Sequence, residues 1–90
     1  MEFEWDQAKS KANLKKHKIS FHEAATVFSD PLAITFSDPD HSMREHRFLT
    51  FGSSRMGQLL VVVHTERYGK TRIISARRAT KRERKIYEEG

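Results

Sequence analysis

The sequence contains no cysteine, which excludes disulfide bonds, a thiol nucleophile and any metal centre built on thiolates. Long apolar runs are also absent, because the longest covers only residues 59–63 and a membrane span needs about 20 residues. The first residues are acidic and aromatic, whereas a signal peptide begins with a basic and then an apolar segment. We therefore expect a cytoplasmic protein whose stability comes from packing alone.

The length and charge of the chain narrow its class further. The 90 residues leave room for one hydrophobic core, so we expect a single domain over residues 1–90. Lys and Arg number 17 against 12 Asp and Glu, and residues 67–85 contain nine basic side chains with one acidic side chain, Glu83. Such a segment favours polyanions such as nucleic acid, and an ordinary solvated face fits the same composition equally well.

Hydrophobic periodicity and capping signals divide the chain into strands and helices. Alternating apolar and acidic residues predict a strand at the start of the chain. Ser20 and Thr80 are each followed by Glu three residues later, which predicts two capped helix starts. The predicted strands cover residues 1–5, 32–36, 45–51, 59–66 and 71–77. The predicted helices cover residues 7–17, the segment from Ser20 to a stop at Asp30, and residues 80 to about 89.

The order of these elements predicts an α+β fold. One strand and two helices come first, and four strands and a final helix follow. Consecutive strands joined by short connections form an antiparallel meander. We expect the helices to pack on one face of this sheet and to leave the other face partly open for RNA.

The end of the most apolar strand carries candidate catalytic groups. Strand alternation places His64 and Glu66 on one face and Thr65 and Arg67 on the other. A histidine and a carboxylate near cations supply the proton transfers that cleave an internucleotide linkage through its 2′-hydroxyl. In the alternative interpretation, His64 is structural and is hydrogen-bonded to Glu66.

Arginines on the neighbouring strands are the candidate phosphate ligands. Arg72, Arg77 and Arg78 lie on the last strand, and Arg47 lies on an earlier strand. A guanidinium fork binds a phosphate bidentately and stabilises the dianionic transition state of RNA cleavage. We expect at least one of Arg77 and Arg78 to act in this way, and the other to pair with a carboxylate such as Glu83.

The sequence predicts neither a metal site nor a cofactor. His41 lies near Asp38 and Asp40, but one histidine and two carboxylates at this spacing are typical of a solvated turn. Arg44 and His46 are weaker candidates for a contact with phosphate. A phosphate-binding glycine loop and a nucleophile elbow are both missing from the sequence.

The order of several motifs resembles the BrnT family of toxins. The matching segments are FEWD at 3–6, NLKKH at 13–17, ISF at 19–21, EAA at 23–25, and RIISARRA at 72–79 with Glu83 and Tyr87. They extend over nearly the entire chain. The resemblance implies a fold like that of RelE-type toxins and metal-independent endoribonuclease activity that arrests translation. It also implies a cognate antitoxin, BrnA, with a DNA-binding half.

Carried onto this sequence by position, the resemblance assigns roles to the candidate residues. Arg77 and Arg47 are expected to contact phosphate. His64 and Glu66 are the expected acid and base. Further substrate contacts are expected at Arg67, Arg72, Arg78, Lys16, His17 and Tyr87.

Two other functions fit the same charge pattern. A non-catalytic module would hold RNA or DNA through its basic segment and would leave the nucleic acid intact. A protein-interaction subunit would dock its basic last helix on an acidic partner and would have no affinity for nucleic acid. The resemblance favours the ribonuclease toxin, acting in a hetero-oligomer with its antitoxin.

Overall fold

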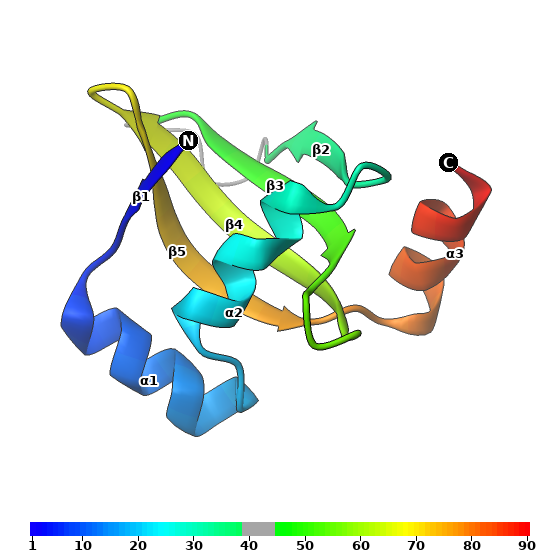
Figure 1. The fold of residues 1–90 in the computed structure, drawn as a ribbon, viewed down its shortest axis with the longest axis horizontal. Helices are drawn as coiled ribbons and strands as arrows, with labels where there is room; N and C mark the ends of the chain where they lie inside the picture. The colour runs from blue at the N-terminus through cyan, green and yellow to red at the C-terminus, as the bar shows by residue number, and fades with distance from the viewer. Residues whose placement is uncertain (39–44) are drawn as a thin grey trace.

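The computed structural model describes residues 1–38 and 45–90, which form a sheet flanked by helices (Figure 1). The elements are β1 (Glu2–Glu4), α1 (Gln7–His17), α2 (Phe21–Thr26), η1 (Val27–Ser29), β2 (Ile34–Ser37), β3 (Arg47–Ser53), β4 (Leu59–Arg67), β5 (Lys70–Arg78) and α3 (Lys81–Glu89). Within the described residues, no helix is both long and apolar enough to cross a membrane.

The sheet is mixed, which corrects the prediction of a purely antiparallel meander. Its strand order is β1-β5-β4-β3-β2. The four strands from β2 to β5 are antiparallel, as predicted, but β1 lies parallel to β5 and pairs Phe3 with Thr71. Alternation in the sequence predicted that β1 is a strand but carried no information about its partner, which is distant along the chain.

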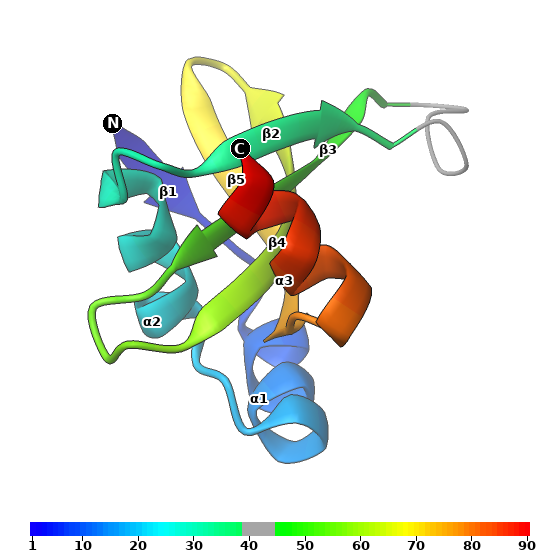
Figure 2. The same cartoon turned by 90° about the vertical axis from the view of Figure 1, so that its right-hand side faces the viewer.

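The helices lie on both faces of the sheet, which corrects a second expectation (Figure 2). The side chain of Ala76 belongs to the core under α1 and α2. The next residue, Arg77, points to the opposite face and donates hydrogen bonds to Glu83 of α3. The prediction failed because α3 follows β5 directly and is held by the side chain that points away from the core.

The core lies between the sheet and the first two helices. Its fully buried members are Ile19, Phe21, Ala24, Val27, Leu60, Val62, Ile73 and Ala76. Ala25 and Phe28 pack against this cluster. Phe21, Ala24, Ala25 and Phe28 therefore form the apolar stripe that their helical spacing in the sequence predicts. Phe3 on β1 contacts Phe28 with ring centroids 5.4 Å apart, which joins the edge strand to the helical layer.

A buried asparagine completes the edge of the sheet. Because β1 pairs with β5 only at residues 70–72, no strand in the described part of the chain pairs with the rest of that edge of β5. The Asn13 side chain donates to the backbone oxygens of Ile19 (3.0 Å) and Ala76 (2.9 Å) and accepts from the Ala76 amide (3.1 Å). It thus satisfies backbone groups that another strand would otherwise bind.

We expect Asn13→Ala to lower the free energy of unfolding by about 2 kcal/mol, because it removes the partner of one buried backbone donor and two backbone acceptors. Urea denaturation followed by circular dichroism measures the change. The neighbouring Leu14 is 50% exposed, so Leu14→Ala serves as the control and should change stability by less than about 0.5 kcal/mol. Equal stabilities of the two variants would show that the Asn13 contacts are dispensable.

Candidate active site at the end of the sheet

Strand β4 brings three of the predicted arginines onto one face of the sheet. Thr65 pairs with Arg47 on β3 and with Arg72 on β5, so these three side chains form a row across the sheet. Arg67 lies two residues further along β4 and points to the same face. Neighbouring strands are about 5 Å apart, so the arginines are close enough to act on one substrate.

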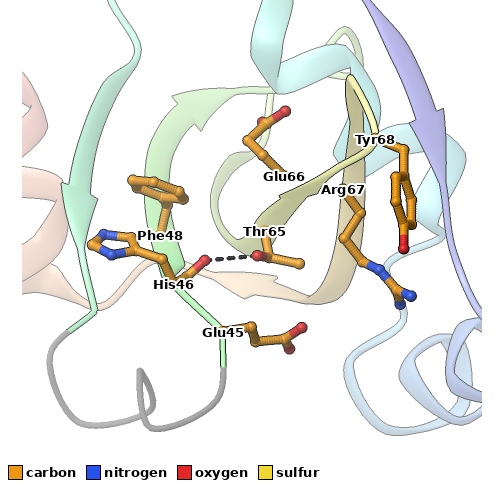
Figure 3. Close-up of a pocket in the computed structure, with 7 residues that line it drawn as sticks. All are labelled: Glu45, His46, Phe48, Thr65, Glu66, Arg67 and Tyr68. Atoms are coloured by element: carbon orange, nitrogen blue, oxygen red, sulfur yellow. Dashed lines mark hydrogen bonds between the residues drawn. The ribbon is translucent and has the colours of Figure 1, made fainter.

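The row ends at an open hollow of about 700 Å³ beside the β4–β5 turn (Figure 3), which we call the sheet-end hollow. Its lining residues are Glu45, His46, Phe48, Thr65, Glu66, Arg67 and Tyr68. His46 and Phe48 lie on one side of the hollow and Arg67 and Tyr68 on the other, with Thr65 and Glu66 between them. Imidazole, carboxylate and guanidinium groups therefore surround one space.

Hydrogen bonds position the carboxylates of the hollow. Arg47 donates through Nε to Glu45 Oε1 at 3.3 Å. On the other face, the Thr71 hydroxyl donates to Glu66 Oε1 at 2.9 Å. Among the residues that the structure describes, Arg67 forms neither a hydrogen bond nor an ion pair, and it is exposed. Its guanidinium can therefore take up a phosphate without breaking an existing contact.

His46 and Thr65 connect the strands on either side of the hollow. The Thr65 hydroxyl donates to the backbone oxygen of His46 at 2.6 Å (Figure 3). The exposed His46 ring lies 4.5 Å from the Phe48 ring, and its Nε2 is 3.1 Å from the Ser37 hydroxyl. The ring is therefore positioned from two sides while it remains accessible.

His64 lies on the sheet face that α1 and α2 cover, whereas the arginines lie on the opposite face. It is 4% exposed, its Nε2 is 2.7 Å from the Thr50 hydroxyl, and its ring packs against Phe28 and Phe48. Burial lowers the pKa of His64, and the nearby charge of Glu66 opposes this effect. The structure therefore places His64 inside the protein, hydrogen-bonded to Thr50 rather than to Glu66.

Two contacts attach α3 to the rest of the fold, one from Arg77 on β5 and one from Tyr87 to Asp30 after η1. Arg77 donates to both oxygens of Glu83 at 2.7 and 2.8 Å, and these hydrogen bonds hold the pKa of Glu83 at about 2. The Tyr87 hydroxyl donates to Asp30 at 2.6 Å, which raises the pKa of Tyr87. The sequence predicted that one of Arg77 and Arg78 pairs with a carboxylate such as Glu83, and in the structure this arginine is Arg77. Arg77 also pairs with Val61, four residues along β4 from the row at Thr65.

The remaining predicted residues gather at the opposite end of the sheet. Arg78 donates to the backbone oxygen of His17 at 3.4 Å and to Gln58 Oε1 at 2.8 Å. Lys16 and His17 line a smaller hollow together with Lys9 and Ser75. We call this region the basic end; its members are Lys9, Lys16, His17, Arg78 and Arg84.

Three residues of the hollow that could bind or act on a substrate were not predicted as main candidates from the sequence. Glu45 was assigned only to a strand and Tyr68 only to a turn, and His46 was a minor candidate. Asp40, His41 and Arg44 lie outside the described residues. Within residues 1–38 and 45–90, no group of three or more His, Asp or Glu side chains is placed to hold a metal ion.

Comparison with known proteins assigns a class and then a family. The fold is similar to that of the 1.1 Å crystal structure of the Brucella abortus ribonuclease toxin BrnT, with a TM-score of 0.66 and 20% identity, over 90% of this chain and 99% of that chain. The comparison with curated protein sequences finds no significant match. The family model described as the ribonuclease toxin BrnT of type II toxin–antitoxin systems matches residues 5–83. The chain is thus a ribonuclease-type toxin, and it belongs to the BrnT family. The resemblance seen in the sequence is confirmed, and the likeness to RelE-type toxins stays a prediction.

The Arg77–Glu83 pair predicts a specific dependence of stability on pH. The pKa of Glu83 is about 2 in the folded protein, against an ordinary value of 4.5. The contribution of the pair is therefore complete above pH 4.5 and is lost as the pH falls toward 2. Because solvent screens the pair, we expect Glu83→Gln to lower the free energy of unfolding by about 1 kcal/mol at neutral pH.

Urea unfolding of both proteins across this pH range tests the prediction. The difference between wild type and Glu83→Gln should shrink below pH 4.5 and vanish near pH 2. Glu88→Gln changes an exposed carboxylate on the same helix and is the matched control. A difference that stays constant with pH would contradict an ion-pair origin.

Proposed function

We propose that this chain is an endoribonuclease toxin whose active site is the sheet-end hollow. The family model supports ribonuclease activity. The choice of the hollow as the active site is supported by the placement of Glu45, His46 and Arg67 around one open space, with Arg47 hydrogen-bonded to Glu45. These groups are a base, an acid and phosphate ligands, which is the set that RNA cleavage needs.

The proposed reaction transfers the phosphoryl group within the RNA. Glu45 removes the proton of a 2′-hydroxyl, and the freed oxygen forms a bond to the adjacent phosphorus. The bond from phosphorus to the 5′-oxygen breaks, and His46 donates a proton to that leaving oxygen. The products are a 2′,3′-cyclic phosphate and a 5′-hydroxyl, and no side chain becomes covalently modified.

The arginines stabilise the charge that develops on the phosphate. The attacked phosphorus passes through a dianionic, five-coordinate arrangement, and guanidinium groups fixed around it lower its energy. Arg67 is free among the described residues, and Arg47 and Arg72 flank Thr65 next to it. Arg72 lies 3.7 Å from Glu4, a contact long enough for a phosphate oxygen to compete with it.

The basic end supplies contacts to more distant phosphates. Lys16, His17 and Arg78 are therefore assigned to substrate binding, as the sequence predicted. The nine residues of β4 span about 30 Å between the two ends of the sheet, so the substrate has to be several nucleotides long. Binding through these lysines and arginines is expected to weaken steeply as the salt concentration rises.

In the cell, cleavage would arrest translation, and a protein partner would control it. Type II toxin–antitoxin systems pair the toxin with an antitoxin protein. We propose that a BrnA-like antitoxin with a DNA-binding half neutralises this chain in a cytoplasmic hetero-oligomer. Co-expression with the product of the neighbouring gene should restore growth if this assignment is correct.

Substitutions in the hollow test the catalytic assignment. We expect His46→Ala and Arg67→Ala each to lower kcat/KM for a fluorescent RNA oligonucleotide by about a hundredfold or more, with an unchanged circular dichroism spectrum. His22→Ala and Arg55→Ala replace exposed residues of the same types elsewhere and should retain full activity. Undiminished cleavage by folded His46→Ala and Arg67→Ala would remove the hollow as the active site.

The independence from metal ions is a separate prediction. The wild-type cleavage rate should be the same with and without excess EDTA, because side chains perform both proton transfers. Mass spectrometry of the products should find cyclic phosphate ends. Loss of activity in EDTA with recovery on adding Mg²⁺, or RNA that is bound but stays intact, would contradict the mechanism. The second result would instead favour the non-catalytic binding module.

A further inference from the structure

The turn between β4 and β5 contains a residue in an unfavourable backbone conformation. Arg67 pairs with Lys70, so the loop consists of Tyr68 and Gly69 alone. Both have positive φ, 52° and 79°, the pattern of the tight turn that suits twisted hairpins. Glycine adopts this region freely and asparagine tolerates it, but the Cβ of a tyrosine clashes with its own backbone there. Tyr68 therefore lowers the stability of the turn.

Packing does not compensate for this strain. The Tyr68 side chain is 95% exposed, and its ring contacts no other aromatic ring among the described residues. It nevertheless lines the sheet-end hollow beside Arg67, opposite His46 and Phe48 (Figure 3). A residue that costs stability and gains no burial, at the rim of a candidate active site, indicates a contact with something outside the chain.

We propose that Tyr68 forms a nucleobase-binding subsite, in which its ring stacks on a base of single-stranded RNA while Arg67 contacts the adjoining phosphate. This subsite depends on the proposed function and adds a substrate-binding role that catalysis alone does not need. Unstacked bases bind to aromatic side chains next to cations, and every base offers a flat face for this contact. The subsite is therefore tolerant of base identity.

The surroundings of Tyr68 favour RNA over a protein partner. The neighbouring side chains in the hairpin are charged and exposed: Glu66, Arg67 and Lys70. None of the other largely exposed apolar residues in the described part of the chain lines the hollow. A protein contact site buries its aromatic anchor within an apolar patch, whereas one ring beside one guanidinium is enough for a nucleotide.

Two substitutions separate the role of the ring from its effect on the turn. Tyr68→Asn removes the ring and suits the backbone, and Tyr68→Phe keeps the ring and the strain. The probe is a 2′-O-methyl oligoribonucleotide of about ten residues, which lacks the attacking hydroxyl and cannot be cleaved by the proposed route. Fluorescence anisotropy measures its Kd, and thermal unfolding measures Tm.

We expect Tyr68→Asn to bind the probe about five- to a hundredfold more weakly and Tyr68→Phe to bind within about twofold of wild type. The Tm of Tyr68→Asn should stay the same or rise by up to about 5 °C as the strain is removed. A merely structural tyrosine would instead lose stability and affinity together. Met56, 74% exposed in the opposite hairpin connection, provides the control Met56→Asn, with unchanged Kd.

The other outcomes decide between this subsite and the proposed function. Equal probe affinity of wild type and Tyr68→Asn overturns the subsite, and so does a loss of antitoxin affinity without a loss of probe affinity. If wild type cleaves no RNA but Tyr68→Asn still weakens the probe, the subsite stands and the ribonuclease proposal fails. If wild type cleaves RNA and Tyr68→Asn changes neither binding nor cleavage, the ribonuclease proposal stands and the subsite fails.

Discussion

Successive side chains of β4 point to opposite faces of the sheet, and α1 and α2 cover one of these faces. This constraint divides the polar residues at the end of the strand into two sets. His64 falls on the covered face and is buried, whereas Thr65 and Arg67 fall on the other face with Arg47 and Arg72. A site that needs both an imidazole and several arginines therefore cannot form in the middle of β4.

At the end of the sheet, side chains from the two faces are no longer separated. Among the described residues, the pairing of β3 with β4 ends at Arg47 and Thr65, and side chains from both faces border the same hollow just beyond this pair. His46 lines this hollow, whereas His64 does not, and Glu45, which precedes β3, accepts a hydrogen bond from Arg47 at the start of that strand. Contacts away from the hollow fix the other elements of the fold. Asn13 completes the edge of β5, and the Arg77–Glu83 pair holds α3 on the opposite face.

Local signals in the sequence predicted the local structure well. The helix starts at Ser20 and Thr80, the hairpins and the apolar stripe of Phe21, Ala24, Ala25 and Phe28 depend on residues close together in the chain, and the structure contains them. The reciprocal capping box forms only at Thr80, because the Glu23 side chain accepts from Ser54 and Gln58 instead of from the Ser20 amide. The parallel β1–β5 pair and the position of α3 depend on distant partners, which alternation cannot identify. The same limit applies to the site. Strand alternation placed Arg67 on the same face as Thr65. The sequence near His64, however, gave no sign that helices cover the face on which His64 lies. A tyrosine at a turn position that suits asparagine was the available signal for Tyr68.

A crystal structure of the chain with an uncleavable 2′-O-methyl oligoribonucleotide tests the central claim most directly. The account predicts a phosphate within hydrogen-bond distance of Arg67, with Glu45 and His46 on opposite sides of it along the line from the attacking 2′-oxygen to the leaving 5′-oxygen. RNA whose phosphates contact only Lys16, Arg78 and α3, with the sheet-end hollow empty, would contradict it.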